Sequence, residues 1–231
     1  MRINKFIAHS GYASRRKADI LIENSKVYVN NKIITDYSYD VKVDDIVRIN
    51  NQILTLEKKV YFKLNKPVGT ICSNFDPFNS KKVIDLVDTK KRIYPVGRLD
   101  KDSEGLILLT NDGEITNKII HPSKKVEKEY IVKVNSNLSE LQMEEFISGI
   151  KLEEKVTERC FLKLIDKNKS VYKVIIHEGL NRQIRRMFAY FGKNVYSLKR
   201  IRIGKIQLGN LKIGTYQKLN TDELNYLKDL I

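Results

Sequence analysis

Residues 97–113 read Gly-Arg-Leu-Asp-Lys-Asp-Ser-Glu-Gly-Leu-Ile-Leu-Leu-Thr-Asn-Asp-Gly, a charged loop followed by an apolar run and a turn. The apolar run, residues 106–109, lies between Gly105 and an Asn-Asp-Gly turn, which is typical of a buried strand. The loop before it contains Arg98 and the acids Asp100, Asp102 and Glu104. Loops at the ends of rigid strands often carry chemistry, so one of these acids is a candidate catalytic group. A solvated turn whose acids only cap and solubilise is the alternative interpretation.

Strand patterns recur along the rest of the chain from residue 60 onward, with only occasional helical patterns between them. We expect strands at 60–64, 106–109, 130–134, 161–165, 171–177 and 195–198, and helices near 114–120, 139–149 and 182–191. Strands and helices do not alternate regularly, so a doubly wound parallel sheet is not expected. The pattern predicts an α+β domain over residues 60–231.

Residues 1–58 are predicted to form a separate small domain. Apolar residues at helical spacing near the start indicate a first helix that ends at Gly11, and Ser14 is a suitable cap for a second. Short alternating strands are expected around 27–29 and 47–49, next to turns. A cluster of three bases, Arg15-Arg16-Lys17, opens the second helix; either it faces an anionic partner or it is an exposed first turn.

The charge of the chain indicates a polyanionic partner. The sequence has 43 Lys plus Arg against 28 Asp plus Glu, a formal net charge of +15, which suits nucleic acid and, in our interpretation, RNA. Residues 179–212 contain no acid, although a solvated face normally mixes both signs. We therefore predict a phosphate-contacting surface there. Its bases are Arg182, Arg185, Arg186, Lys193, Lys199, Arg200, Arg202, Lys205 and Lys212.

Other features narrow the possible classes of protein. Cys72 and Cys160 have no Cys-x-x-Cys spacing and the three histidines are scattered, so neither a zinc site nor a disulfide framework is indicated, and both cysteines are expected to be reduced and structural. No segment has the apolar length of a secretory signal or membrane span, which predicts a cytoplasmic protein. A P-loop and a dinucleotide fingerprint are also absent from the sequence.

The loop at Asp100 resembles the catalytic motif of the bacterial ribosomal pseudouridine synthases of the RsuA, RluB and RluF group. Three further stretches match the group in the expected order: Asn-Lys-Pro-Val-Gly at 65–69, Lys-Glu-Tyr at 128–130, and His-Glu-Gly-Leu-Asn-Arg-Gln-Ile-Arg-Arg-Met at 177–187. Four ordered matches over nearly the whole chain are a specific signal. The resemblance implies a mixed, mostly antiparallel sheet with a central cleft, and an S4-like RNA-binding domain at residues 1–58.

The resemblance also implies roles for individual residues. Asp100 becomes the obligate catalytic carboxylate, which either attacks the sugar or stabilises its cleaved state. A buried aspartate needs a cation beside it to stay ionised. The family pattern assigns that cation to Arg185 and turns Arg182 and Arg186 toward phosphate or packing. Tyr130 is expected to lie against the target uracil, although a strand tyrosine is usually core packing.

Contacts to RNA are expected from bases of both domains. The uridine must be flipped out of the RNA stack, and Arg98 is expected to help hold the opened site. Leu198 is a candidate for the apolar wall beneath the base. The full set of expected RNA-contacting residues is Arg15, Arg16, Lys17, Arg98, Arg182, Arg186, Lys199, Arg200 and Arg202.

Within the group, the motifs at 97–103 and 179–187 look most similar to RluF, which implies a uridine in large-subunit ribosomal RNA as target. A transfer RNA is a further candidate substrate. Small-subunit ribosomal RNA remains the alternative target, and a non-enzymatic RNA-binding factor for ribosome assembly is the alternative class of protein. We expect no cofactor, no metal and no membrane partner, and we expect a monomer.

Overall fold

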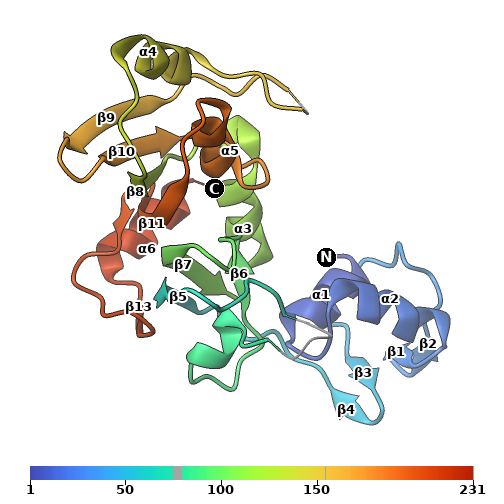
Figure 1. Ribbon diagram of the computed structural model, residues 1–231. Helices are drawn as coiled ribbons and strands as arrows, with labels where there is room; N and C mark the ends of the chain where they lie inside the picture. Colours follow the sequence, from blue (N-terminus) through green and yellow to red (C-terminus); the bar gives the residue numbers. More distant parts are fainter. Residues whose placement is uncertain (75–79, 154, 231) are drawn as a thin grey trace. The chain divides into compact units, whose positions relative to one another are not determined.

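The computed structural model describes residues 1–74, 80–153 and 155–230, which form two compact units (Figure 1). The first unit contains residues 1–60 and a short segment, residues 89–93. The second contains the rest of the chain. The sequence did not indicate that 89–93 belongs with the first unit. Two side chains of that segment donate to backbone carbonyls of residues 1–60. Lys91 donates to the carbonyl of Lys58 at 2.9 Å, and Arg92 donates to the carbonyl of Ala13 at 3.3 Å.

The first unit contains two helices and a small sheet in the order β2-β1-β3-β4, with every pair antiparallel. The elements are α1 (Ile3–His9), α2 (Arg15–Glu23), β1 (Val27–Val29), β2 (Lys32–Ile33), β3 (Val47–Ile49) and β4 (Gln52–Ile53). The Ser14 side chain accepts from the Lys17 amide at 3.2 Å, so it caps α2 as expected. Ile7, Ile22 and Ile49 are among the fully buried residues of the core.

Two asparagine pairs close the hairpins of this sheet. Asn30 and Asn31 have φ of 47° and 65°, and Asn50 and Asn51 have φ of 48° and 64°. Tight hairpin turns of this type need two consecutive residues with positive φ, and asparagine tolerates that conformation well. The turn residues therefore specify the strand pairing of the small unit locally.

The second unit is built on a long mixed sheet in the order β13-β5-β7-β11-β8-β10-β9, with β12 paired to β11 and β6 to β7. The strands are β5 (Tyr61–Lys66), β6 (Tyr94–Val96), β7 (Glu104–Thr110), β8 (Lys128–Val134), β9 (Phe161–Asp166), β10 (Val171–Ile176), β11 (Val195–Ile203), β12 (Ile206–Gln207) and β13 (Tyr216–Lys218). The helices are η1 (Val83–Leu86), α3 (Gly113–Ile120), η2 (Pro122–Lys124), α4 (Glu140–Ser148), α5 (Gln183–Tyr190) and α6 (Thr221–Asp229). Only the β7–β11 pair is parallel among these described strands.

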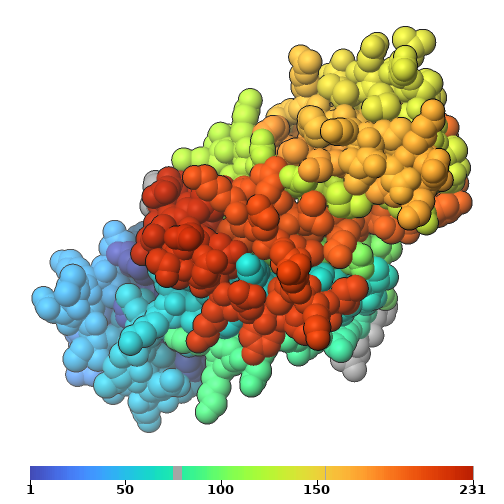
Figure 2. Space-filling model, turned by 90° about the vertical axis from the view of Figure 1, so that its left-hand side faces the viewer, coloured from blue at the N-terminus to red at the C-terminus, as the bar shows by residue number. Residues whose placement is uncertain are grey.

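Helices pack on this sheet through two groups of buried side chains. Leu106 of β7 belongs to one core cluster with Ile115 of α3. Phe146 of α4 and Tyr172 of β10 both pack against Phe188 of α5, with ring centroids 4.9 and 5.5 Å apart. Figure 2 shows one face of this unit, where the orange and red C-terminal elements form a continuous surface.

The α+β prediction is confirmed, and each strand and helix expected in the second unit is present. The structure adds the strands β6, β12 and β13 and the helix α6, which we did not expect. A signal for α6 was available, because Asn220 and Glu223 have capping-box spacing. In the structure each side chain accepts from the other's backbone amide, at 2.9 and 3.0 Å. Among the described residues, no helix has both the length and the apolar character needed to cross a membrane.

Candidate active site

The loop of residues 97–103 joins β6 to β7, and groups from an earlier segment hold its backbone. Lys66, the last residue of β5, is fully buried, and its ammonium donates to the Ser103 carbonyl at 2.6 Å. Burial lowers the pKa of Lys66 from its ordinary value. The Gly69 amide donates to the Lys101 carbonyl at 2.8 Å. The Asn-Lys-Pro-Val-Gly stretch is thus a support for the loop.

Two further contacts fix the part of the loop next to Asp100. The Leu99 amide donates to the sulfur of Cys72 at 3.3 Å, and the Ser103 amide donates to the Asp100 carbonyl at 3.1 Å. Burial raises the pKa of the Cys72 thiol, so this sulfur stays protonated and acts as a packing group. Cys72 and Cys160 are both free and buried. The backbone on either side of Asp100 is therefore preorganised before any substrate arrives.

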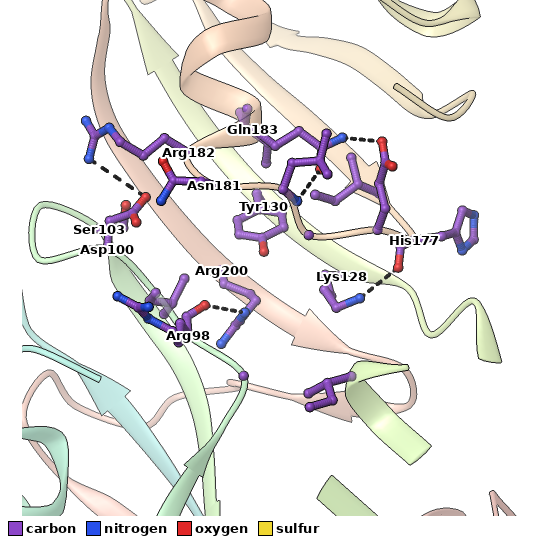
Figure 3. A pocket seen from close by; sticks show the side chains of 18 of the residues that line it. Arg98, Asp100, Ser103, Lys128, Tyr130, His177, Asn181, Arg182, Gln183 and Arg200 are labelled. Carbon is purple, nitrogen blue, oxygen red and sulfur yellow. Dashed lines mark hydrogen bonds and ion pairs between the residues drawn. The ribbon is translucent and has the colours of Figure 1, made fainter. Parts of the chain in front are cut away.

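Asp100 opens onto a cavity of about 490 Å³ in the second unit (Figure 3). Tyr130 of β8 and Leu198 of β11 line the same cavity, as do Arg98 and Arg200. The Tyr130 residue is 7% exposed, while the Asp100 side chain is 29% exposed. The structure thus brings together residues that lie far apart in the sequence and that the sequence analysis had assigned to one site.

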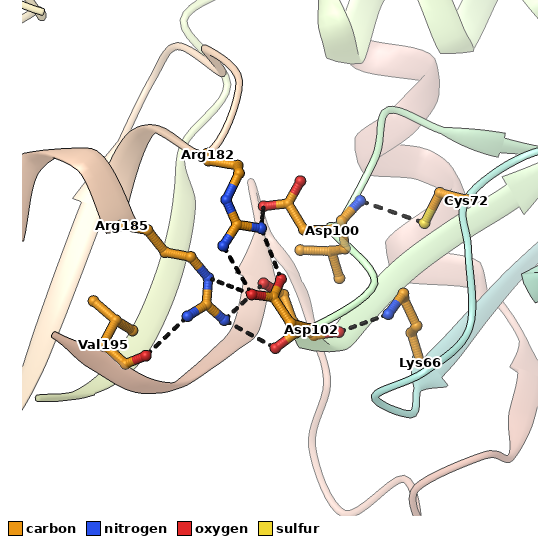
Figure 4. A network of polar contacts seen from close by, with 9 residues as sticks. Lys66, Cys72, Asp100, Asp102, Arg182, Arg185 and Val195 are labelled. Carbon is orange, nitrogen blue, oxygen red and sulfur yellow. Dashed lines mark hydrogen bonds and ion pairs between the residues drawn. The ribbon is translucent and has the colours of Figure 1, made fainter.

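The cation next to Asp100 is not the predicted one. Arg182 lies nearest among the described ion pairs, with its Nη1 atom 3.8 Å from a carboxylate oxygen of Asp100. Its main partner is Asp102, to which its two terminal nitrogens donate at 3.0 and 2.9 Å (Figure 4). These hydrogen bonds lower the pKa of Asp102 and raise that of Arg182. Arg182 adopts a left-handed backbone conformation just before α5, which aims its side chain at this loop.

Arg185 binds the same loop without an ion pair to Asp100 in the structure. Its Nε atom lies 3.4 Å from the Asp102 carboxylate, and its Nη2 atom donates to the Asp102 carbonyl at 2.9 Å. Its Nη1 atom donates to the Val195 carbonyl at 2.9 Å. Burial lowers its pKa from the usual arginine value. The expected pairing of Arg185 with Asp100 is thus replaced by a shared contact of Arg182 and Arg185 with Asp102.

The expected RNA-contacting bases differ in how exposed their side chains are. Arg15, Arg16 and Lys17 are exposed on the first turn of α2, and Arg98 is an exposed residue at the rim of the cavity. Arg186 is half-buried on α5.

The predicted phosphate surface on β11 needs correction. Arg200 is 3% exposed and faces the cavity. Lys199, the preceding residue of an extended strand, points to the opposite face of the sheet. Arg202 lies 2.7 Å from Glu129 and 2.8 Å from Glu127, so two carboxylates of the β8 region neutralise it. The acid-free stretch of sequence therefore has acidic neighbours from another segment of the chain. Lys199, Arg200 and Arg202 do not form a shared phosphate-binding face.

Sequence reasoning missed Lys128 as a cavity residue, although it lies in the Lys-Glu-Tyr motif. Its ammonium donates to the His177 carbonyl at 2.8 Å and to the Val126 carbonyl at 3.1 Å. Burial, and then the nearby charge of Arg200, lowers the pKa of Lys128 to about 8. A lysine facing an enclosed site at such a pKa changes charge just above neutral pH.

A buried carboxylate anchors the loop that enters α5. Glu178 is 5% exposed and accepts from Gln183 Nε2 at 2.6 Å and from the Glu158 amide at 2.8 Å. Lys155 lies 2.5 Å from its other oxygen. Gln183 also accepts from the Leu180 amide at 3.1 Å. This network fixes the loop that presents Arg182 to the Asp100 side of the cavity.

Comparison with known proteins identifies the fold and its chemistry. A family model described as RNA pseudouridylate synthase matches residues 60–190. The chain belongs to this family. A second model, the S4 domain, matches residues 1–47. The pseudouridine synthase domain thus contains the whole Asp100 loop and the cavity-lining strand β8.

Relatives of this pseudouridine synthase match it over its full length. The "Ribosomal large subunit pseudouridine synthase B" of Bacillus subtilis (strain 168) is 42% identical, over 99% of this chain and 96% of the relative. The "Dual-specificity RNA pseudouridine synthase RluF" of Escherichia coli (strain K12) is 39% identical, over all of this chain and 79% of the relative. A solved structure titled "Crystal structure of pseudouridylate synthase" is 32% identical, with a TM-score of 0.72 and full coverage of both chains. The resemblance stated from the sequence motifs is confirmed.

Proposed function

We propose that this pseudouridine synthase converts a uridine of large-subunit ribosomal RNA to pseudouridine, with Asp100 as the catalytic carboxylate. The observation that carries the proposal is the cavity in which Asp100 faces the strand that holds Tyr130. A cavity of about 490 Å³ has the size typical of small-ligand pockets. The name of the Bacillus relative supports the large subunit as target. The dual specificity in the name of the Escherichia relative supports a second RNA, for which a transfer RNA is our candidate.

The proposed reaction uses a flipped-out uridine in the cavity. The C1′–N1 bond breaks, the uracil turns, and C5 bonds to C1′, so that the net change moves one proton from C5 to N1. The reaction needs no oxidant or reductant. Asp100 neutralises the positive charge that develops at C1′, either as a nucleophile or as a fixed anion. We assign Tyr130 to the face of the uracil, since its ring lies in the cavity wall.

The arginines of α5 act on the loop that holds Asp100. Arg185 binds the Asp102 carbonyl and carboxylate, which makes it a positioning residue for the catalytic loop. Arg182 stands between the Asp100 and Asp102 carboxylates and is exposed enough to meet an incoming phosphate. We propose that Arg98, which lines the cavity, and Arg186 on α5 add phosphate contacts.

We further propose that residues 1–58 select the RNA and residues 60–231 carry out the reaction. The exposed bases Arg15, Arg16 and Lys17 at the start of α2 support an RNA-facing role for the first domain. Every group proposed for chemistry lies after residue 60. Removal of residues 1–58 is therefore expected to reduce RNA selectivity more than the rate of the chemical step.

The proposal is tested with Asp100→Asn, which keeps the size of the side chain and removes its charge. We expect no release of tritium from C5 of labelled uridine in RNA, while RNA affinity and the thermal unfolding profile stay near those of the unmodified protein. Asp222→Asn, an exposed change in the first turn of α6, serves as the matched control. Pseudouridine formation by the Asp100→Asn protein would refute the assignment.

Mapping pseudouridine in total RNA, with and without the gene, identifies the target. We expect a lost signal in large-subunit ribosomal RNA. A loss confined to small-subunit ribosomal RNA would retain the chemistry and refute the target. Complete rescue of the deletion by Asp100→Asn, with no pseudouridine missing, would indicate a non-enzymatic assembly factor.

RNA affinity and its dependence on salt test the first domain. Neutralising Arg15, Arg16 and Lys17 together should weaken binding to unrelated RNA sequences and reduce the salt slope by about 2, at roughly 0.7 to 0.9 per phosphate contact. Lys32→Gln, on the exposed strand β2, is the control. An unchanged slope would show that the start of α2 does not face RNA.

A further inference from the structure

Arg200 is a buried cation that faces the cavity with one nitrogen unused. The residue is 3% exposed and lines the cavity with Asp100 and Tyr130 (Figure 3). Its Nε atom donates to the Leu106 carbonyl at 2.7 Å, and its Nη1 atom makes a long contact of 3.5 Å with the Arg98 carbonyl. Within the described residues, its Nη2 atom is buried and has no hydrogen-bond partner. A buried donor without a partner is costly, so the guanidinium in the cavity wall has donor capacity left for a ligand that enters the cavity.

The charge of Arg200 also lacks a carboxylate partner among the described ion pairs. A guanidinium stays protonated in proteins, and burying it without a counter-charge is unfavourable. Its field reaches Lys128 in the wall of the same cavity and also the fully buried Lys66, since it contributes to lowering the pKa of both groups. Arg98, Lys128 and Arg200 all line the cavity. Such a site stabilises an anion that forms within it.

The backbone geometry fixes the direction of the guanidinium. Arg200 on β11 is the register partner of Gly105 on β7. The Leu106 carbonyl that accepts from Nε belongs to the same strand, immediately after Gly105. Because strand pairing and a short hydrogen bond hold one edge of the guanidinium, its orientation is set before the substrate binds. Preorganised donors of this kind are the most effective in stabilising developing charge.

We propose that Arg200 is a catalytic residue that stabilises the uracil anion formed when the C1′–N1 bond breaks. When that bond breaks, N1 keeps the electron pair, and the negative charge spreads to the two carbonyl oxygens O2 and O4. The Arg200 guanidinium donates to one of these oxygens, while Asp100 neutralises C1′. The charge on uracil is consumed when C5 bonds to C1′. This inference rests on the proposed function and assigns a role in the step to a residue that the sequence placed on a phosphate surface.

The test compares Arg200→Gln with Lys199→Gln in single-turnover reactions on a short RNA stem-loop that contains the target uridine. Lys199 is the matched control because it neighbours Arg200 in sequence but points to the other face of β11. Loss of one preorganised donor to a developing anion slows reactions by about 10²- to 10³-fold. We expect a loss of that size for Arg200→Gln, with the RNA dissociation constant changed by less than about threefold, and almost no effect for Lys199→Gln.

RNAs with 2-thiouridine or 4-thiouridine at the target position identify the accepting oxygen. Sulfur accepts hydrogen bonds weakly. The unmodified protein should therefore react more slowly with the RNA in which the accepting oxygen is replaced. The Arg200→Gln protein should lose this discrimination. Equal discrimination in both proteins would overturn the proposal.

Two more variants separate catalysis from folding. Arg200→Lys keeps the charge but cannot keep the Leu106 contact and also reach the uracil, so we expect a slower reaction with unchanged RNA affinity. Added methylguanidinium should restore part of the rate of Arg200→Ala in a saturable way. A normal rate for Arg200→Lys overturns the inference, as does weaker RNA binding at an unchanged rate, which would indicate a phosphate contact. If the unmodified protein forms no pseudouridine on any RNA, the proposed function itself has failed.

Discussion

Replacing Gly105 by alanine would place a methyl group against the backbone of Arg200 on β11. Gly105 is buried and has a φ of 103°, a conformation that side chains rarely adopt. A Cβ atom there would lie 2.2 Å from the Arg200 carbonyl oxygen and 2.8 Å from its nitrogen. Both obstacles are backbone atoms in a paired strand. They cannot turn away as a flexible side chain could.

The stability loss follows from three contributions. The positive φ costs about 1 to 2 kcal/mol for a residue with a Cβ atom. Overpacking against the neighbouring strand adds about 1 to 3 kcal/mol. One weakened hydrogen bond of the parallel β7–β11 pair adds about 1 kcal/mol. We therefore expect Gly105→Ala to destabilise the second unit by about 3 to 6 kcal/mol.

Gly192→Ala is the matched control for backbone conformation alone. Gly192 has a φ of 69°, and an added Cβ would meet no atom within 4 Å. Its cost should be about 1 to 2 kcal/mol. At about 2 to 4 °C per kcal/mol for a chain of this size, calorimetry should show Gly105→Ala unfolding at least about 4 °C below Gly192→Ala.

Activity is the second readout of Gly105→Ala. A shift of about 1 Å in a catalytic group can reduce a rate by about 10²-fold. We expect such a loss in single-turnover pseudouridine formation, measured well below the unfolding temperature, while Gly192→Ala stays near the unmodified rate. If the two variants have the same stability and the same rate, the close approach of β7 and β11 does not explain the glycine.

Three further predictions concern charged groups of the second unit. Glu223→Gln keeps an acceptor for the cap of α6 but leaves the buried Lys63 ammonium, 2.6 Å from the carboxylate, without its counter-charge. Urea unfolding should show that the free energy of unfolding falls by about 1.5 to 3 kcal/mol, and by about 3 to 5 kcal/mol for Glu223→Ala. A fully stable Gln variant would contradict this. Because hydrogen bonds from Arg182 lower the pKa of Asp102, this carboxylate adds stability above about pH 4 that is lost as the pH falls through its lower folded pKa. The urea midpoints of Asp102→Asn and of the unmodified protein should therefore converge in strong acid. A constant difference at every pH would count against the Arg182–Asp102 pair. Lys128, whose pKa is lowered to about 8, releases its proton at a lower pH in the folded protein than in the unfolded chain. Its contribution to stability therefore rises with pH from about 8 to about 10.4. Competitive acetylation with mass spectrometry should give a midpoint near pH 8, and a midpoint near 10 would refute the burial of this ammonium.

Local patterns predicted most of the fold. The apolar run at 106–109, the alternation at 130–134 and the helical spacing at 182–191 each became the expected element. These patterns are readable because side-chain periods of 2 and 3.6 residues depend on the backbone of one segment alone. The short elements β6 and β13 escaped, since their three residues are too few to show a period. Helix α6 escaped although its capping box was present.

The residues proposed for function show the same division. The sequence patterns assigned the Asp100 loop, Tyr130 and the α5 motif to one site, and the structure places all three around or next to one cavity. The choice of Arg182 as the neighbour of Asp100 depends on a left-handed residue at the entry to α5. The supports that Lys66 and Cys72 give to the loop join segments more than 25 residues apart.

The sequence by itself determined the strand and helix types and the excess positive charge, and it pointed to two domains and to the Asp100 loop as the proposed catalytic loop. Only the tertiary structure decided which of those charges are available. The stretch from 179 to 212 contains no acid, yet Arg202 is neutralised by Glu127 and Glu129, more than 70 residues earlier. Arg200 lies two residues before Arg202, and residues two apart on a regular strand share a face. A bulge between them shifts the alternation, so Arg200 faces the cavity while Arg202 does not. Coulomb interactions and burial depend on distance in space, which strand pairing sets and linear spacing does not.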